Sequence, residues 1–96
     1  MTINFLLQAI KILTTNEYDE NQLYTMVNFI NAVDNDVLND YNNTCTILSY
    51  NSDLELFTEV LDALIKVLEE NEDYEICEIL KNKKEDCIAI METKTI

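Results

Sequence analysis

The stretch SDLELFTEVLDALIKVL, residues 52–68, carries the clearest structural signal in the chain. Its apolar residues recur at steps of three and four, the spacing of one face of an α-helix. They are Leu54, Phe57, Val60, Leu61, Leu64, Ile65 and Leu68. Ser52 and Glu55 have the types and spacing of a capping box, in which each side chain bonds a backbone N–H at the helix start. The stretch therefore predicts an amphipathic helix that begins after Ser52.

A second helix is expected after the polar turn at residues 69–73. It runs from about Tyr74 toward Met91, with Cys77 and Cys87 on its apolar side and the charged run KNKKED in its middle. We expect that charged middle to be solvated, because six consecutive polar residues leave little to bury. The two helices predict a hairpin over residues 52–92.

The N-terminal part predicts another helical hairpin, over residues 2–33. Residues 3–13 are apolar except at Asn4, Gln8 and Lys11, so we expect a helix that is buried on most sides. Residues 21–33 alternate apolar and polar positions at helical spacing, which predicts an amphipathic helix.

The connector between the hairpins, residues 34–51, has two parts of different composition. Its first part is rich in Asp and Asn, which favour turns, although Val37, Leu38 and Tyr41 could form one short helical turn. Its second part, TCTILSY at residues 44–50, is β-branched and aromatic and favours a strand. The available partner is the similar C-terminal tail, from about Ala89 to Ile96. We therefore predict one all-α domain, a bundle of about four helices, with a short two-stranded β element as an open alternative.

The two hairpins share a sequence pattern. Placing residue 6 over residue 61 aligns two copies of Leu-x-x-x-Ile-Lys-[Ile/Val]-Leu-x-x-Asn-Glu. This indicates duplication of one hairpin. The alternative is chance similarity between two amphipathic helices in a chain of narrow composition.

Residues 73–82, DYEICEILKN, also resemble the UVR motif, the helical hairpin of the UvrB and UvrC repair proteins. The first three positions and Leu80 match the motif, whereas Glu78, Lys81 and Asn82 depart from it. The resemblance covers about residues 60–90. It implies a protein-docking hairpin that pairs with a similar hairpin and performs no chemistry.

The composition argues against an enzyme. The chain has no Gly, Pro, Trp or His, so it lacks the glycine loops that bind phosphate and the histidine that usually serves acid–base catalysis. Its three cysteines have no zinc-ligand spacing, and the paired glutamates are not followed by the Glu-x-x-Asp of helical magnesium enzymes. We therefore expect no catalysis, no cofactor and no metal site.

The net charge of −13, from 19 acids and six lysines, limits the partners. It argues against direct binding to nucleic acid or to an anionic membrane, and it permits a protein partner with a basic surface. The alternative is that the excess acid only keeps a small domain soluble. No signal peptide or membrane anchor is evident, so we expect a cytoplasmic protein with free thiols.

The candidate partner-binding site is the acidic face opposite the leucines of residues 52–68, continued across the following turn. Its residues are Glu55, Glu59, Asp62, Glu69, Glu70, Glu72, Asp73, Glu75 and Glu78. They predict a small acidic adaptor or inhibitor. One alternative is a DNA-mimic inhibitor of a nucleic-acid-binding protein, as in phages and mobile elements. Another is a self-associating structural subunit, for which the apolar helix at residues 3–13 would form a homodimer.

Overall fold

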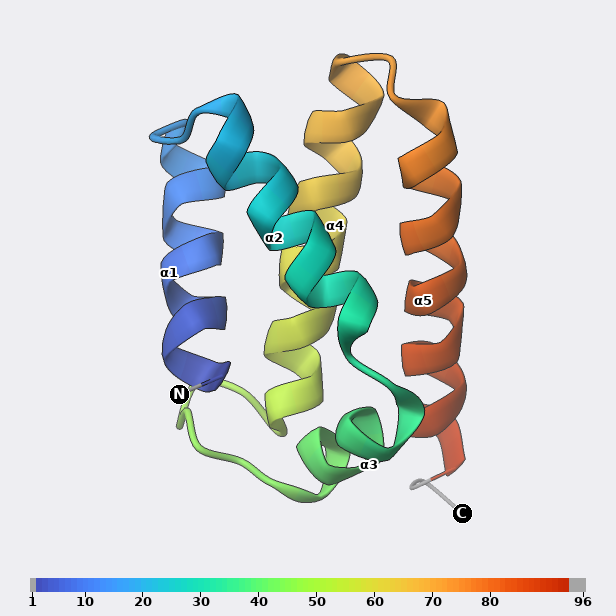
Figure 1. Cartoon of the computed structure of the whole chain (residues 1–96). Coiled ribbons are helices and arrows are strands. Elements are labelled where there is room, and N and C mark those ends of the chain that lie inside the picture. The colour runs from blue at the N-terminus through green and yellow to red at the C-terminus, as the bar shows by residue number, and fades with distance from the viewer. Residues whose placement is uncertain (1, 94–96) are drawn as a thin grey trace.

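The computed structural model describes residues 2–93, which form five α-helices and no strand. In chain order they are α1 (Thr2–Thr15), α2 (Glu20–Ala32), α3 (Asn35–Asn43), α4 (Asp53–Glu70) and α5 (Tyr74–Thr93). Figure 1 shows α4 in the middle, with α1 and α5 on either side, α2 crossing in front and α3 at the lower end. The all-α class is confirmed, with one helix more than expected.

Helix α4 takes the central position because it offers the widest apolar face. Leu54, Phe57, Leu61, Leu64 and Leu68 are all fully buried, as the sequence predicts. The capping box is only half formed. The side chain of Ser52 accepts a hydrogen bond from the Glu55 N–H at 3.4 Å, but the Glu55 carboxylate accepts from the N–H of Asn51, at 2.6 Å, instead of that of Ser52.

Helix α1 lies at the side of the bundle, so the prediction of burial on most sides is wrong. Its buried residues are Leu6, Ala9 and Leu13, on the face that packs against α4. The remaining apolar side chains of α1 are only partly buried: Ile3, Phe5, Leu7, Ile10 and Ile12. Helix α4 occupies the centre of the bundle in place of α1, because α4 is apolar over a longer stretch and is covered from several sides.

Helix α2 confirms the predicted amphipathic segment and begins one residue earlier. Asp19 and Gln22 form a complete capping box, with hydrogen bonds of 2.8 and 2.9 Å between side chain and backbone in both directions. The buried residues of α2 are Leu23, Met26, Val27 and Ile30. Phe29 packs against Phe5 of α1, with 4.2 Å between ring centroids.

Helix α3 lies in the predicted connector, residues 34–51, and with nine residues it is longer than the one short helical turn expected there. The Asp34 side chain accepts from the N–H of Val37 at 3.1 Å and so caps the helix. Leu38 and Tyr41, three residues apart, are buried against α4 and α5. Two apolar side chains one turn apart, together with an N-cap, outweigh the turn preference of the surrounding Asp and Asn.

Residues 44–50 form a turn-containing loop, so the alternative of a strand at this position is not confirmed. The buried carboxylate of Asp53 accepts hydrogen bonds from the backbone N–H and the hydroxyl of Thr46, each at 2.8 Å. The N–H of Tyr50 then bonds the carbonyl oxygen of Ile47 at 3.1 Å and closes a turn. The expected partner strand is also missing up to residue 93, because α5 continues to Thr93. The rest of that tail lies outside the described residues.

The middle of α5 is less solvated than the charged run KNKKED predicts. Lys83 and Lys84 are half-buried. The ammonium group of Lys83 donates to the carbonyl oxygens of Asn31 and Val33 at the end of α2. A cation placed at a helix C-terminus satisfies free carbonyl groups and opposes the helix dipole. Cys77, Leu80 and Cys87 are buried on the predicted side.

Helices α1 and α4 end in the same way, which bears on the proposed duplication. Asn16 and Glu72 take left-handed backbone angles, with φ of 58° and 61°. The following N–H groups of Glu17 and Asp73 bond carbonyl oxygens five residues back, at 3.0 and 2.9 Å. These are Schellman-type ends, formed without the usual glycine. The sequence pattern aligns Asn16 with Asn71, so the two ends are displaced by one residue, and duplication stays a hypothesis.

Candidate interaction surface

The predicted acids of α4 lie opposite its buried leucines. Glu59, Asp62, Glu69 and Glu70 are exposed, and Glu55 is half-buried. Helical residues three or four apart are neighbours on the surface, so these side chains form a stripe along the helix. We call these five residues the α4 acidic stripe. Lys66 is exposed four residues after Asp62 and places a positive charge in the same stripe.

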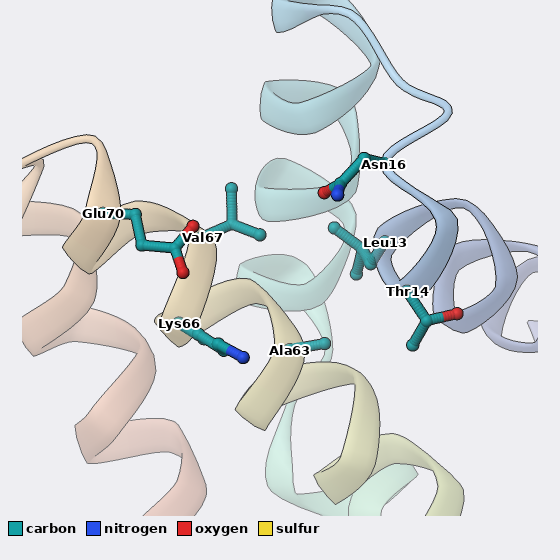
Figure 2. A pocket seen from close by; sticks show the side chains of 7 residues that line it. All are labelled: Leu13, Thr14, Asn16, Ala63, Lys66, Val67 and Glu70. Atoms are coloured by element: carbon teal, nitrogen blue, oxygen red, sulfur yellow. The ribbon is translucent and has the colours of Figure 1, made fainter.

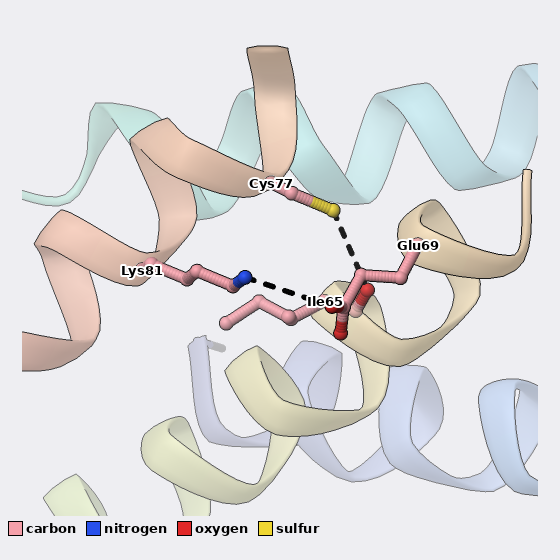
Figure 3. Close-up of polar contacts among 4 residues, drawn as sticks. All are labelled: Ile65, Glu69, Cys77 and Lys81. Atoms are coloured by element: carbon pink, nitrogen blue, oxygen red, sulfur yellow. Dashed lines mark hydrogen bonds and ion pairs between the residues drawn. The ribbon is translucent and has the colours of Figure 1, made fainter. Parts of the chain in front are cut away.

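Two lysines of α5 reach the middle of the α4 acidic stripe. The Lys84 Nζ lies 2.5 Å from the Asp62 Oδ1, and the Lys81 Nζ lies 3.6 Å from the Glu69 Oε2. Figure 3 shows Lys81 extending to Glu69 beside the contact between the Cys77 thiol and the Ile65 carbonyl oxygen, at 3.5 Å. Exposed ion pairs contribute less than about 1 kcal/mol each. These ion pairs matter more for partner binding than for stability, because they reduce the net negative charge that this part of the stripe presents to a partner.

The acids of the α4–α5 turn do not extend the stripe without interruption. Asp73 is half-buried, and its Oδ2 accepts a hydrogen bond from the Tyr24 hydroxyl at 2.5 Å. That bond, followed by burial, raises the pKa of Tyr24. Glu72, Glu75 and Glu78 are exposed. Asp73 therefore serves to hold α2 against the turn, while its three neighbours remain open to a partner.

The N-terminal end of the stripe is organised by neutral donors instead of lysines. The Tyr50 hydroxyl donates to the Glu59 Oε2 at 2.5 Å, and the side-chain amide of Asn51 donates to the Glu55 Oε1 at 3.2 Å. The hydrogen bond to Glu59, followed by burial, raises the pKa of Tyr50. Both carboxylates are thus held in place by neutral hydrogen-bond donors.

A shallow hollow of about 280 Å³ lies between α1 and the C-terminal half of α4. Figure 2 shows the apolar side chains of Leu13, Ala63 and Val67 toward its floor, with Lys66 and Glu70 on its α4 side. The two charged side chains have opposite sign, so the hollow carries little net charge. It offers no strong preference for an anionic or a cationic group.

Within residues 2–93, no group of three or more Cys, Asp or Glu side chains is arranged to hold a metal ion. None of the helices in this part of the chain combines the length and apolar character needed to cross a membrane.

Among the cysteines, Cys45 is exposed, whereas Cys77 and Cys87 are buried. Burial raises the pKa of Cys77, and it raises that of Cys87 to about 11. The two buried thiols therefore stay protonated and pack as small apolar groups.

Two features of the site were not predicted from the sequence: the lysines that contact the stripe, and the loop that ends beside it. Lys84 carried a usable signal, since it follows Leu80 by four residues and precedes Cys87 by three, which places it at the edge of the buried face of α5. The loop at residues 44–52 carried no such signal, because its shape depends on a hydrogen bond to Asp53.

Comparisons with family models, curated proteins and solved structures found no match to this chain. Residues 60–90 do fall within the antiparallel pair of α4 and α5, as a helical hairpin requires. The resemblance to the UVR motif, and the docking role that it implies, stay a prediction.

Proposed function

We propose that the protein is a small acidic adaptor or inhibitor that binds a basic surface of a partner protein and performs no catalysis. The observation that carries this proposal is the α4 acidic stripe, which places five acids on one side of the best-packed helix. A rigid helix presents its charges with little loss of conformational entropy on binding. The free thiols favour a cytoplasmic location, where they stay reduced.

The pattern of ion pairs favours an adaptor over a DNA mimic. A mimic needs a row of unpaired negative charges in place of successive phosphates. In this chain Asp62 and Glu69 contact lysines of α5, and Lys66 lies between them on the stripe. A partner with a few basic side chains fits these separated acidic positions better than a continuous phosphate-binding groove does.

The test starts from a pull-down in the native host, followed by binding kinetics of each recovered protein with the purified chain. We expect the association rate to fall about tenfold between 50 and 300 mM salt, because charge steering is screened. The double variant Glu59→Lys and Glu70→Lys should slow association similarly. The matched control is Glu85→Lys with Asp86→Lys, which makes the same charge change at exposed positions outside the predicted site.

Three outcomes separate the alternatives. Rates that depend on neither salt nor the Glu59 and Glu70 reversals would show that the stripe is only a solvated surface. Competition by double-stranded DNA for the recovered partner would favour the mimic. Equal effects of the two double variants would indicate attraction by net charge without a defined site.

A second candidate function, self-association, rests on α1. Ile3, Leu7 and Ile10 are only partly buried on one flank of this helix, and α1 contains no acid in a chain of net charge −13. Two copies could meet there with little repulsion. We expect light scattering to show a dimer at high concentration and Leu7→Lys to abolish it. A strict monomer at millimolar concentration would contradict this candidate.

A further inference from the structure

Leu48 is the most exposed large apolar residue among residues 2–93, with 99% of its surface open to solvent. It lies at the tip of the turn that the N–H of Tyr50 closes onto the carbonyl oxygen of Ile47. A single exposed leucine is common on protein surfaces. This one is distinguished by the rigid support beneath it and by the hollow beside it.

The support is a set of hydrogen bonds between the loop at residues 44–52 and the first turns of α4. The Asp53 N–H donates to the Thr44 carbonyl oxygen at 2.7 Å, and the Asp53 carboxylate accepts twice from Thr46. The thiol of Cys45 donates to the Tyr50 carbonyl oxygen at 2.9 Å. The loop is therefore ordered before any partner arrives, which lowers the entropic cost of binding.

The hollow begins at the residue that follows Leu48. It has a volume of about 390 Å³ and is lined by Ser49, Tyr50, Glu55, Thr58, Glu59 and Met91. Tyr50 and Met91 supply apolar surface, while the two glutamates supply negative charge. Within residues 2–93 no lysine lines it, in contrast to the middle of the α4 acidic stripe, where Lys81 and Lys84 lie against Glu69 and Asp62. Among the described residues, neither Glu55 nor Glu59 at this end of the stripe forms an ion pair with a lysine.

We propose that the Leu48 loop and this hollow dock a short segment of a partner protein that carries an apolar side chain next to a Lys or Arg. The apolar side chain packs between Leu48, Tyr50 and Met91, and the cation pairs with Glu55 and Glu59. Charge complementarity selects this occupant over a second copy, because each copy brings a net charge of −13. The inference rests on the proposed function and assigns one end of the stripe to it.

The experiment uses the full chain and three synthetic peptides. The first is a 15-residue amphipathic peptide with Leu and Lys on adjacent positions of one helical face. The second replaces its leucines with serine, and the third replaces its lysines with glutamine. Amide chemical-shift changes in the ¹⁵N-labelled protein locate the contact. We expect the first peptide to perturb residues 46–59 and the neighbourhood of Met91, and both control peptides to bind at least about tenfold more weakly.

Variants of the protein test the same contact. Leu48→Ser should weaken the first peptide about tenfold, and Glu59→Gln should weaken it severalfold. The matched control is Ile79→Ser on α5, which removes another exposed apolar side chain and should leave the affinity within about twofold. Circular dichroism confirms that each variant is folded.

Several outcomes would overturn the inference. Shifts centred on residues 69–78, or equal losses for Leu48→Ser and Ile79→Ser, would place the contact elsewhere and leave the proposed function standing if binding still weakens with salt. Shifts at residues 46–59 that depend on protein concentration alone would identify a second copy as the occupant. Binding that gives no localised chemical-shift changes and does not weaken with salt would reject both proposals.

Discussion

The carboxylate of Asp53 holds Thr46 through two hydrogen bonds of 2.8 Å, one to its backbone N–H and one to its hydroxyl. Asp53 is only 3% exposed, and it is the first residue of α4. One buried acid thus joins the loop at residues 44–52 to the central helix. A buried carboxylate is stable only when its oxygens are paired, so the loop conformation and the burial of Asp53 depend on each other.

The first prediction concerns this pair. Thr46→Val keeps the shape of the side chain and removes one donor to Asp53, so the free energy of unfolding should fall by about 1–2 kcal/mol. Urea unfolding measures it. The control is Thr25→Val, whose hydroxyl bonds only the Asn21 carbonyl oxygen within α2 at an exposed position. The control should change stability by less than about 0.5 kcal/mol. Equal losses would contradict the role of the pair.

The second prediction compares neighbouring lysines of α5. Lys83→Met removes the cation that caps the carbonyl groups of Asn31 and Val33, and should cost about 1–2 kcal/mol of unfolding free energy. Lys84→Met removes an ion pair with an exposed acid and should cost about 0.5 kcal/mol or less. Methionine keeps the aliphatic stem in both variants. A larger loss at Lys84 would show that the α4–α5 ion pair matters more than the α2 cap.

The third prediction uses the same chemical change at two extremes of burial. Leu61 is fully buried and Leu48 is 99% exposed. Leu61→Ala should lower the free energy of unfolding by about 3 kcal/mol, because it removes contacts and leaves a cavity in the core. Leu48→Ala should leave stability within about 0.5 kcal/mol. Leu61→Asp should unfold the domain, as a charge in the core has no partner.

The fourth prediction concerns thiol reactivity. A thiol reacts as its thiolate, and only when the reagent reaches it. Cys45 is exposed, while Cys77 and Cys87 are buried with raised pKa values. At pH 8 we expect one thiol to react quickly with a disulfide reagent and the other two to react only after denaturation. Three fast thiols in the folded protein would contradict the burial of Cys77 and Cys87.

The fifth prediction follows from the pKa of Cys87, which burial raises to about 11. Its unfolded value is about 8.5, so between these values the folded state holds one more proton than the unfolded state. Stability contributed by the protonated thiol is therefore complete below about pH 8.5 and is lost as pH rises toward 11. Unfolding measured from pH 8 to 11 should show this decline, and Cys87→Ala should reduce its slope. An unchanged slope would assign the decline to other groups.

The helices with strong periodicity could be predicted from the sequence. The leucine spacing of α4 predicts both its existence and its buried face, and the Leu23, Met26 and Ile30 pattern does the same for α2. For helix α3 only one short helical turn could be predicted, because its nine residues are mostly Asp and Asn and its stability depends on packing Leu38 and Tyr41 against two other helices. A short helix gains too little from its own hydrogen bonds to form without such contacts.

The candidate site was likewise predictable from the sequence only in part. That the acids of α4 point away from the core follows from helical spacing alone, since a 3.6-residue period separates leucines from glutamates. The lysine contacts of Asp62 and Glu69 and the bond between Asp73 and Tyr24 required the tertiary structure. So did the exposure of Leu48 and the hollow that Ser49 and Tyr50 line together with Glu59. These contacts join residues whose approach is set by how whole helices pack.

The sequence by itself determined the helical class, the central amphipathic helix and the excess of negative charge, because local spacing and composition act within a few residues of the chain. Only the tertiary structure decided which charges remain uncompensated and which apolar side chains remain exposed. The physical reason is the sequence separation of the residues in contact. Lys83 contacts residues 50 and 52 positions earlier in the chain. Such contacts form only because the helices pack with α4, and not α1, at the centre of the bundle.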